Sequence, residues 1–516
     1  MAPHRKVAAD GEEQTPHDPK AVSNPSGITG KLCTWIHDTT ISSIPDDVVR
    51  RAKYLILDGI ACGLVAAHLP WSETAARAIF NMEPEGQCTV MGWGGSRSES
   101  GGKKLSPLAA SILNSTFIQG FELDDYHSTA PLHSCSILIP ALFAAVEAEG
   151  PARTFSGRDY LKAFIVGCEV GPRVGLALHG TDLLSRGWHS GAVQGPSASA
   201  AAVSSLLGLP AGYIESALGI ACTQAGGLMS AQFGSMAKRM QHGFASRNGL
   251  FATLLAKEGY TGIQEVYETP YGGFLSMFSE GVTNFSPKSV PEELVNGLGE
   301  KWELHGVRVK LHAAMAALHG TIDCIEKLQK EHESLFAAEN LVNIESITTQ
   351  HSKPAFEHGG WTAPPDKPLT STAAQMSIQY AAAAQLVDHE VLMAQFGADK
   401  LNRPQLRELM AKITPTHNPE FDSDKRKGWR TVVTVRFKDQ QGKTTEVETL
   451  VDGPKGIMPP ASEEDIVTKW RMLVRDVLDN ERRDQIEKCV LGMDKLEDVR
   501  ELIALLEGTV KCPIVV

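Results

Sequence analysis

The chain has 516 residues, of which 42% are hydrophobic and 21% are charged, and its formal net charge is -12. This length predicts two or more domains, and the composition is that of a globular protein. The acidic balance and the lack of a basic tract exclude nucleic acid as the expected partner.

Nine cysteines are scattered along the chain without a CxxC pair, which argues against a disulfide framework and favours a reducing compartment. Residues 1–27 are polar and lack the patterns of a signal peptide or a mitochondrial presequence, so we expect a disordered tail. The best apolar stretch, 196–222, is interrupted by Pro196, Pro210 and Glu215 and is too broken to span a bilayer. The sequence therefore predicts a cytoplasmic protein without a membrane partner.

Residues 28–300 have the pattern of a large all-helical domain. Apolar residues recur at helical spacing in 28–66, and helices rich in Ala, Ser and Gly follow one another from 105 to about 260. Small residues at these positions allow helix backbones to approach closely. The Gly- and Ser-rich segment 92–104 lacks the phosphate-binding loop signature, so we expect a flexible surface loop there.

The pattern changes after about Lys301 to a mixture of strands and helices. We expect strands at 307–311, 343–350, 429–437 and 444–451, the last two forming a hairpin, and helices at 313–332 and 373–393. Charged amphipathic helices at 462–480 and 494–507 end the chain. The sequence thus predicts a mainly α fold, in which an α+β lid domain at 301–455 is inserted and residues 456–516 return to the helical domain.

The first group of residues that suggests chemistry is Asp124, Asp125, His127 and His133. Neighbouring carboxylates can orient an imidazole, fix its tautomer and raise its pKa, which produces a general acid near neutral pH. The same side chains could instead bind a divalent metal, or be the solvated charges of a helix end. The density of acidic and imidazole groups favours a functional site.

Two further groups suggest anion binding. His189 precedes an Ala- and Ser-rich helix, and the free N–H groups at a helix N-terminus suit a carboxylate. Lys238 and Arg239 are adjacent cations in an acidic protein, which also indicates an anion site. On spacing alone, a capping histidine and a solvated helix end explain these groups at least as well.

A fourth group is Arg308, Lys310, His312 and His319. Strand alternation places Arg308 and Lys310 on one face. The two histidines are seven residues apart, so they share a face if both lie in the predicted helix. Taken singly, each of these four residues also fits a structural role.

The sequence contains no nucleophile elbow, no H-E-x-x-H zinc motif and no dinucleotide-binding motif in a strand context. Its chemical inventory is His, Lys, Arg and Asp. These groups predict proton transfer on a polycarboxylate, without a cofactor and without a resident metal.

Several motifs follow one another in a fixed order: Ala52–Cys62, Leu123–His127, Pro131–Ser134, Gly187–His189, Ala221–Ala225, Gly227–Gln232, Lys238–Arg239, Tyr271–Phe274 and Val309–Leu311. This series resembles the MmgE/PrpD superfamily, and within it the fungal cis-aconitate decarboxylase branch. The resemblance extends from residue 28 to the C-terminus. It implies a homodimer, with an active site at the junction of the helical and α+β domains.

The resemblance also implies which residues form the site. It assigns catalytic roles to one acidic and imidazole set, Asp124, Asp125, His133, His189 and His319. It assigns binding of a small tricarboxylate substrate to a second set, Lys238, Lys310, Arg239 and Tyr126. The implied reaction is decarboxylation of cis-aconitate to itaconate, with a general acid that protonates carbon as the double bond shifts.

Three positions depart from the superfamily pattern. Gln241 stands where a histidine is usual, with His242 displaced by one residue. Met315 replaces a histidine of the animal relatives, and Gln375 stands for a Lys or Arg of the lid helix. These departures leave the proton donor open. The same groups also fit a dehydratase of 2-methylcitrate or another alkylcitrate, or a dimeric paralogue that binds a polycarboxylate without turnover.

Overall fold

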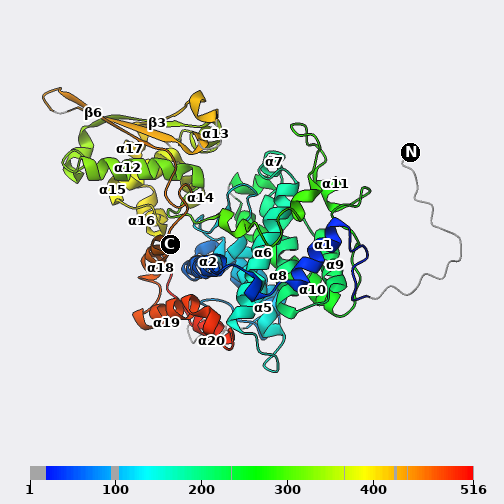
Figure 1. The fold of residues 1–516 in the computed structure, drawn as a ribbon. Helices are drawn as coiled ribbons and strands as arrows, with labels where there is room; N and C mark the ends of the chain where they lie inside the picture. The colour runs from blue at the N-terminus through cyan, green and yellow to red at the C-terminus, as the bar shows by residue number, and fades with distance from the viewer. Residues whose placement is uncertain are drawn as a thin grey trace.

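The computed structural model describes residues 19–94, 104–233, 235–364, 367–423, 427–438 and 440–514. Figure 1 shows a large helical domain beside a smaller part that contains a four-stranded sheet. This arrangement confirms the predicted fold class, mainly α with a smaller α+β part. Most of the expected loop at 92–104, and most of the expected N-terminal tail, lie outside the described residues.

The helical domain packs through small residues. Its helices are α1 Ile28–Asp38, α2 Asp46–Ala66, α3 Pro70–Met82, α4 Pro107–Ile118, α5 Ser134–Ala148, α6 Gly157–Ala177, α7 Asp182–Ser185, α8 Ser190–Leu207, α9 Ala211–Cys222, α10 Gln241–Lys257 and α11 Phe274–Phe278. Every residue of α8 is buried, and most are Ala, Ser or Gly. A Cβ at Gly249 of α10 would lie 2.4 Å from the Cβ of Ser199 in α8, so only Gly permits this close approach.

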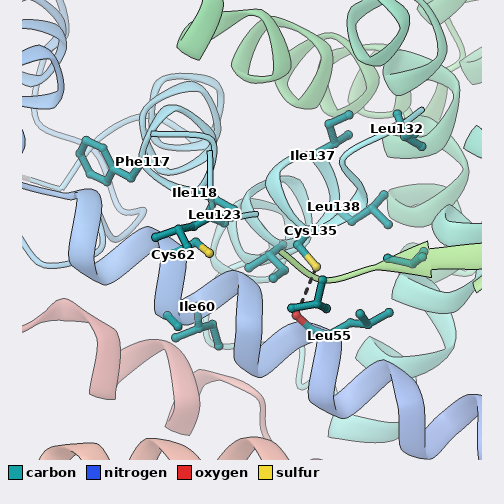
Figure 2. Packing of buried hydrophobic residues seen from close by; sticks show 14 of the residues in the cluster. Leu55, Ile60, Cys62, Phe117, Ile118, Leu123, Leu132, Cys135, Ile137 and Leu138 are labelled. Carbon is teal, nitrogen blue, oxygen red and sulfur yellow. Dashed lines mark hydrogen bonds between the residues drawn. The ribbon is translucent and has the colours of Figure 1, made fainter. Parts of the chain in front are cut away.

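Helix α2 packs its apolar residues against the connection between α4 and α5. From Leu55 to Ala66 every residue of this helix is buried. Figure 2 shows Leu55 and Cys62 of α2 in one apolar cluster with Leu123 and Cys135, and the Cys135 thiol donates to the Leu55 carbonyl at 3.2 Å. This packing fixes the position of the segment that carries the first predicted site residues.

The α+β part contains one sheet with the strand order β4-β3-β5-β6. Its strands are β3 Ile344–His351, β4 Ile413–His417, β5 Thr431–Lys438 and β6 Thr444–Val451, and its helices are α12 His319–Glu331, α13 Lys353–Gly359, α14 Ser371–Gln375, α15 Ile378–Asp388, α16 Ala398–Leu401 and α17 Pro404–Ala411. β3 pairs in parallel with β4 and antiparallel with β5, and β5 pairs antiparallel with β6. The predicted strand at 343–350 and the predicted pairing of the last two strands are therefore confirmed.

The strand predicted at 307–311 is wrong in extent. Only Val307–Arg308 is extended and paired (β2), and its partner is β1 Tyr126–His127. The pairing does not extend to Val309, whose N–H bonds to the carbonyl of Gly456. Lys310 is therefore positioned by the loop after β2 and not by strand alternation with Arg308.

The two helices predicted in the α+β part are also shorter than expected. α12 begins at His319, so His312 lies in the preceding loop and the shared-face argument was wrong. The two imidazole rings still lie 5.1 Å apart, because the loop turns back toward the helix. The run 373–393 is divided into α14 and α15, since Ser377 caps α15 by accepting from the N–H of Tyr380.

Three helices end the chain, α18 Glu463–Val474, α19 Asn480–Leu491 and α20 Arg500–Glu507, and they pack back against α2 and α5. The sequence missed α19, because its charged residues leave little apolar periodicity. Residues 19–27, assigned to the disordered tail, instead pack on the helical domain, where Ser23 bonds to Glu215. No single described helix is long and apolar enough to cross a bilayer, although the bent pair α2 and α3 would pass that test together.

A buried ion pair joins α18 to α2 and to the α4–α5 connection. The ammonium of Lys469 lies 2.6 Å from Asp58 Oδ1 and donates to the Leu123 carbonyl at 2.6 Å. Lys469 is 4% exposed and Asp58 is 1% exposed. Burial alone would lower the pKa of Lys469, but the Asp58 carboxylate outweighs it and raises that pKa above its ordinary value. The lysine therefore stays charged.

We predict that Lys469→Met lowers the free energy of unfolding by about 3–5 kcal/mol, because it leaves the Asp58 carboxylate buried without a partner. The measurement is urea denaturation followed by circular dichroism. The double variant Lys469→Met/Asp58→Leu is the control, and it should recover most of the loss because both charges are gone. A loss below about 1 kcal/mol in the single variant would contradict the role assigned to this pair.

Candidate active site

Residues 120–125, here called the acidic loop, lie where three parts of the chain meet. Three of its carbonyls accept hydrogen bonds from distant side chains: Gly120 from Arg239 at 2.8 Å, Phe121 from Gln375 at 2.8 Å, and Leu123 from Lys469 at 2.6 Å. These donors belong to the helical domain, to the α+β part and to the C-terminal helices. The loop therefore presents its carboxylates at the junction of the predicted domains.

Asp124 and His133 form a buried hydrogen-bonded pair. His133 Nδ1 lies 2.8 Å from Asp124 Oδ2, and the His133 side chain is 21% exposed while that of Asp124 is 1% exposed. Burial alone would raise the pKa of Asp124, but the charge and hydrogen bond of His133, with Lys310, lower it below its ordinary value. Asp124 is therefore a carboxylate, and it orients the His133 ring so that Nε2 faces away from it.

Asp125 performs a different task from its neighbour. Its two carboxylate oxygens accept from the N–H groups of Ser134 and Cys135 at 2.9 and 3.0 Å, at the first turn of α5. Burial, followed by repulsion from Asp124, raises the pKa of Asp125 to about 6. Because α5 begins directly after His133, Asp125 fixes the backbone that carries that histidine.

Three histidines gather beside the acidic loop. The His242 ring lies 4.7 Å from that of His133 and 5.0 Å from that of His189, measured between ring centroids. Its Nδ1 is hydrogen-bonded to Ser136 Oγ at 2.9 Å. A Cβ at Gly191 would lie 2.2 Å from His242 Nε2, so Gly at the start of α8 makes room for this ring.

Burial keeps two of these histidines neutral. It lowers the pKa of His189 to about 3, with a further contribution from His133, and it lowers the pKa of His242 well below its ordinary value. His189 Nδ1 accepts from the N–H of Ala192 at 3.3 Å, as the N-cap of α8. A neutral ring that accepts through Nδ1 carries its proton on Nε2, so His189 is a hydrogen-bond donor toward the cluster.

Lys238 and Lys310 share one carboxylate. Lys238 contacts Glu122 Oε1, and Lys310 Nζ lies 3.0 Å from Glu122 Oε2. Burial lowers the pKa of both ammonium groups, and Lys310 lowers that of Lys238 further. Two buried ammonium groups so close together need an anion, and a single carboxylate satisfies both.

Arg239 connects the two domains and is not directed at the lysine pair. Its guanidinium lies 4.0 Å from the ring centroid of Trp71, and one nitrogen donates to Thr372 Oγ1 at 3.1 Å. Burial lowers the pKa of Arg239 to about 10, which leaves it charged at neutral pH. Its donors already serve Gly120 and α14, so we assign it the task of holding the junction closed.

Two other predicted site residues, Tyr126 and His319, are buried. Tyr126 is in β1 opposite Arg308, and its phenol has no hydrogen-bond partner among the described residues. His319 is fully buried at the start of α12, where its Nε2 is hydrogen-bonded to the Ala314 carbonyl at 3.2 Å. Burial, followed by the nearby His312, lowers the pKa of His319 well below its ordinary value. The roles of both residues stay predictions from the resemblance.

The cluster also offers a set of metal-ligand atoms. One atom from each of Asp124, His133 and His242 lies within 4.8 Å of the others. Asp124 and His133 already bond to each other, and His242 bonds to Ser136. The Asp124–His133 hydrogen bond uses one carboxylate oxygen and one imidazole nitrogen, so each of these residues keeps a second atom that could bind an ion.

Sequence reasoning missed two residues of the site. His242 was treated as displaced from a usual position, yet its ring is the centre of the histidine cluster. Gln241, at the expected position, instead turns away, donating to the Leu228 carbonyl and accepting from the Leu228 N–H. Lys469 is more than 300 residues from the acidic loop, and its place in an amphipathic helix carried no signal of this contact.

Comparison with known families identifies the class of protein. The MmgE/PrpD N-terminal domain matches residues 30–286, and the MmgE/PrpD C-terminal domain matches residues 312–495. The chain belongs to the MmgE/PrpD family, which confirms the resemblance seen in the sequence.

Individual relatives of known name are similar to nearly the whole chain. The chain is 50% identical over 490 residues to the "Cis-aconitate decarboxylase-like protein oryM" of Aspergillus oryzae, covering 94% of this chain and 98% of that protein. It is 47% identical over 493 residues to the "Cis-aconitate decarboxylase" of Aspergillus terreus, covering 95% and 98%. The human "Cis-aconitate decarboxylase" is 28% identical over 486 residues, covering 93% and 95%.

We predict that His189 makes the stability of the protein sensitive to acid. Its pKa is about 3 in the folded protein and about 6.5 in an unfolded chain, so its contribution is complete above pH 6.5 and is lost as the pH falls toward 3. When the pH falls from about 7.5 to 5.5, the wild type should lose unfolding free energy because His189 takes up a proton only in the unfolded chain. The His189→Asn variant has no such group, so its loss should be about 1.4 kcal/mol smaller. Asparagine keeps the N-cap of α8.

Urea denaturation of both proteins at both pH values gives this difference, and the cost of the substitution itself cancels between them. Equal losses in the two proteins would show that the folded His189 takes up a proton as readily as the unfolded one.

Proposed function

We propose that this protein is a cofactor-independent cis-aconitate decarboxylase that produces itaconate and CO2. The observation that carries the proposal is the buried pair Lys238 and Lys310. Both lysines contact the carboxylate of Glu122, which lies two residues before Asp124, the partner of His133. A lysine pair of this kind suits a polycarboxylate, and an oriented imidazole suits proton transfer to carbon. Identity of 46–50%, over nearly the whole chain, to fungal proteins named cis-aconitate decarboxylase or cis-aconitate decarboxylase-like protein supports the same function.

In the proposed reaction, Lys238 and Lys310 bind a substrate carboxylate. The bond between the allylic carbon and its carboxylate breaks, CO2 leaves, and the bonding pair forms the new double bond. The former π pair accepts a proton at the former vinylic carbon. His133 is the first choice for this acid, because Asp124 orients it and its side chain is the partly exposed member of the pair.

The other site residues are assigned supporting roles. His189 is the second choice for the acid, and as a neutral donor it is suited to hold a substrate oxygen. Asp125 positions His133 through the first turn of α5, and Arg239 keeps the α+β part against the helical domain. We also assign His319 and Tyr126 supporting positions around the site, since both are buried.

The test is to incubate the EDTA-treated protein with cis-aconitate, and separately with 2-methylcitrate, and to follow the products by proton NMR. We expect itaconate from cis-aconitate. Methylaconitate from 2-methylcitrate alone would replace the proposal with the dehydratase. Turnover of neither acid would favour a polycarboxylate-binding protein without activity.

In the same assay, His133→Asn should lower kcat by about 10²–10⁴-fold, the usual contribution of a general acid. The matched control is His358→Asn, because His358 is an exposed histidine on α13 bonded only to the nearby Pro354 carbonyl. It should leave kcat unchanged. A His133→Asn enzyme with kcat within twofold of the wild type would move the proton donor to another residue.

We also propose that the protein is a cytoplasmic homodimer. All nine cysteines are free and seven are buried, which suits a reducing compartment. Phe244 and Phe251, seven residues apart on one face of α10, are 40% and 38% exposed. Phe244 and the exposed Leu228 line an open cavity of about 650 Å³, and a second copy would cover this apolar face.

Sedimentation velocity tests the dimer. The wild type should sediment as a dimer, and Phe244→Glu/Phe251→Glu should sediment as a monomer, because each glutamate would be buried in the interface. Met82→Glu, at the 73% exposed Met82 of α3, is the control and should remain a dimer. A dimeric double variant would place the interface elsewhere.

A further inference from the structure

A carboxylate of the protein itself occupies the position between the two lysines assigned to the substrate. Glu122 reaches Lys238 with one oxygen and Lys310 with the other. Its side chain is 12% exposed, and those of Lys238 and Lys310 are 11% and 4% exposed. Glu122 therefore compensates part of the charge of the lysine pair, and another carboxylate would have to compete with Glu122 for the same donors.

The backbone of Glu122 is held in a conformation that most residues avoid. Its φ is 55°, in the left-handed region, where a residue with a Cβ is disfavoured. The flanking carbonyls of Phe121 and Leu123 are fixed by Gln375 and Lys469. Because both neighbours are held in this way, the acidic loop keeps the backbone of Glu122 in place, and the exchange proposed below requires only its side chain to rotate.

The charges around Glu122 give this arrangement a consequence for binding. With Glu122 in place, the two ammonium groups face one internal carboxylate, and Asp124 adds a second negative charge nearby. A ligand carboxylate that approached this set would gain little from the lysines. When Glu122 rotates away from them, two buried ammonium groups are left without a negative partner, and a ligand carboxylate can then pair with both.

We propose that Glu122 is a specificity-determining residue. Its carboxylate occupies the position of a substrate carboxylate between the two lysines, and the substrate displaces it on binding. The proposal rests on the assignment of Lys238 and Lys310 to the substrate. Only a ligand that presents a carboxylate to both lysines, and that gains enough from its other carboxylates to displace Glu122, binds well. The site therefore discriminates for polycarboxylates and against monocarboxylates.

The two lysines come from different parts of the chain, which adds to the argument. Lys238 lies in the 3-10 turn Met236–Met240 of the helical domain, and Lys310 follows β2 at the start of the α+β part. Glu122 thus bridges the domain junction in the unliganded protein. A substrate carboxylate that takes its place preserves this bridge, so exchange does not require the junction to open.

The experiment uses the full chain and tricarballylate, a saturated tricarboxylate that has no double bond to shift. Calorimetry should give a dissociation constant at least about fivefold lower for Glu122→Gln than for the wild type, since the internal competitor has lost its charge. The matched control is Glu147→Gln. Glu147 lies at the end of α5 that is far from the acidic loop, is 11% exposed and is paired with Lys104. Its substitution should leave the dissociation constant within twofold of the wild-type value.

A crystal of the wild-type protein soaked in tricarballylate gives a second measurement that does not depend on the folding of the variant. The proposal expects a ligand carboxylate between Lys238 and Lys310, with Glu122 rotated away. Weaker binding by Glu122→Gln, no binding by either protein, or Glu122 still on both lysines in the soaked crystal would overturn it. Turnover by the wild type is measured separately, so a failed proposed function and a failed exchange give different results.

Discussion

Buried charge at the acidic loop is the constraint on which the site depends. Glu122 and Asp124 reach the junction of the domains as carboxylates, and each has an opposite partner, Glu122 in the lysine pair and Asp124 in His133. Beneath the loop, Lys469 and Asp58 form a third pair. An unpaired buried charge costs several kcal/mol, so these pairs form only when segments far apart in the sequence are assembled together.

The same burial separates the roles of residues that look alike. Asp124 and Asp125 are neighbours, yet the pKa of Asp124 lies below its ordinary value while that of Asp125 is about 6. His189 and His242 are held neutral, and His133 has the carboxylate partner. Paired titratable groups that their surroundings push apart are a general sign of acid–base assignment. Here the two groups that are pushed apart are Asp124 and Asp125, and Asp124 is the one that is hydrogen-bonded to His133.

The departures from the family pattern become understandable from their contacts. The Gln375 amide donates to the carbonyls of Phe121 and Ala313, and its oxygen lies 3.5 Å from an Arg239 nitrogen. A lysine or arginine at this position would place a second cation beside Arg239, and its side chain would have no oxygen to accept a hydrogen bond from Arg239. A neutral amide with one donor end and one acceptor end fits this position.

The sequence determined the fold class, the helices within 28–66 and from 105 to about 260, the pairing of β5 with β6, and the choice of Asp124, His133, Lys238 and Lys310 as candidates, because apolar periodicity and local motifs are properties of neighbouring residues. The exact ends of β2 and α12 were not set by the pattern. Only the tertiary structure showed that Lys469 and Gln375 hold the acidic loop, that His242 joins the histidine cluster, and that His319 and Tyr126 are buried. Such contacts join residues hundreds of positions apart, and the energies that select them arise from burial, which no local pattern contains.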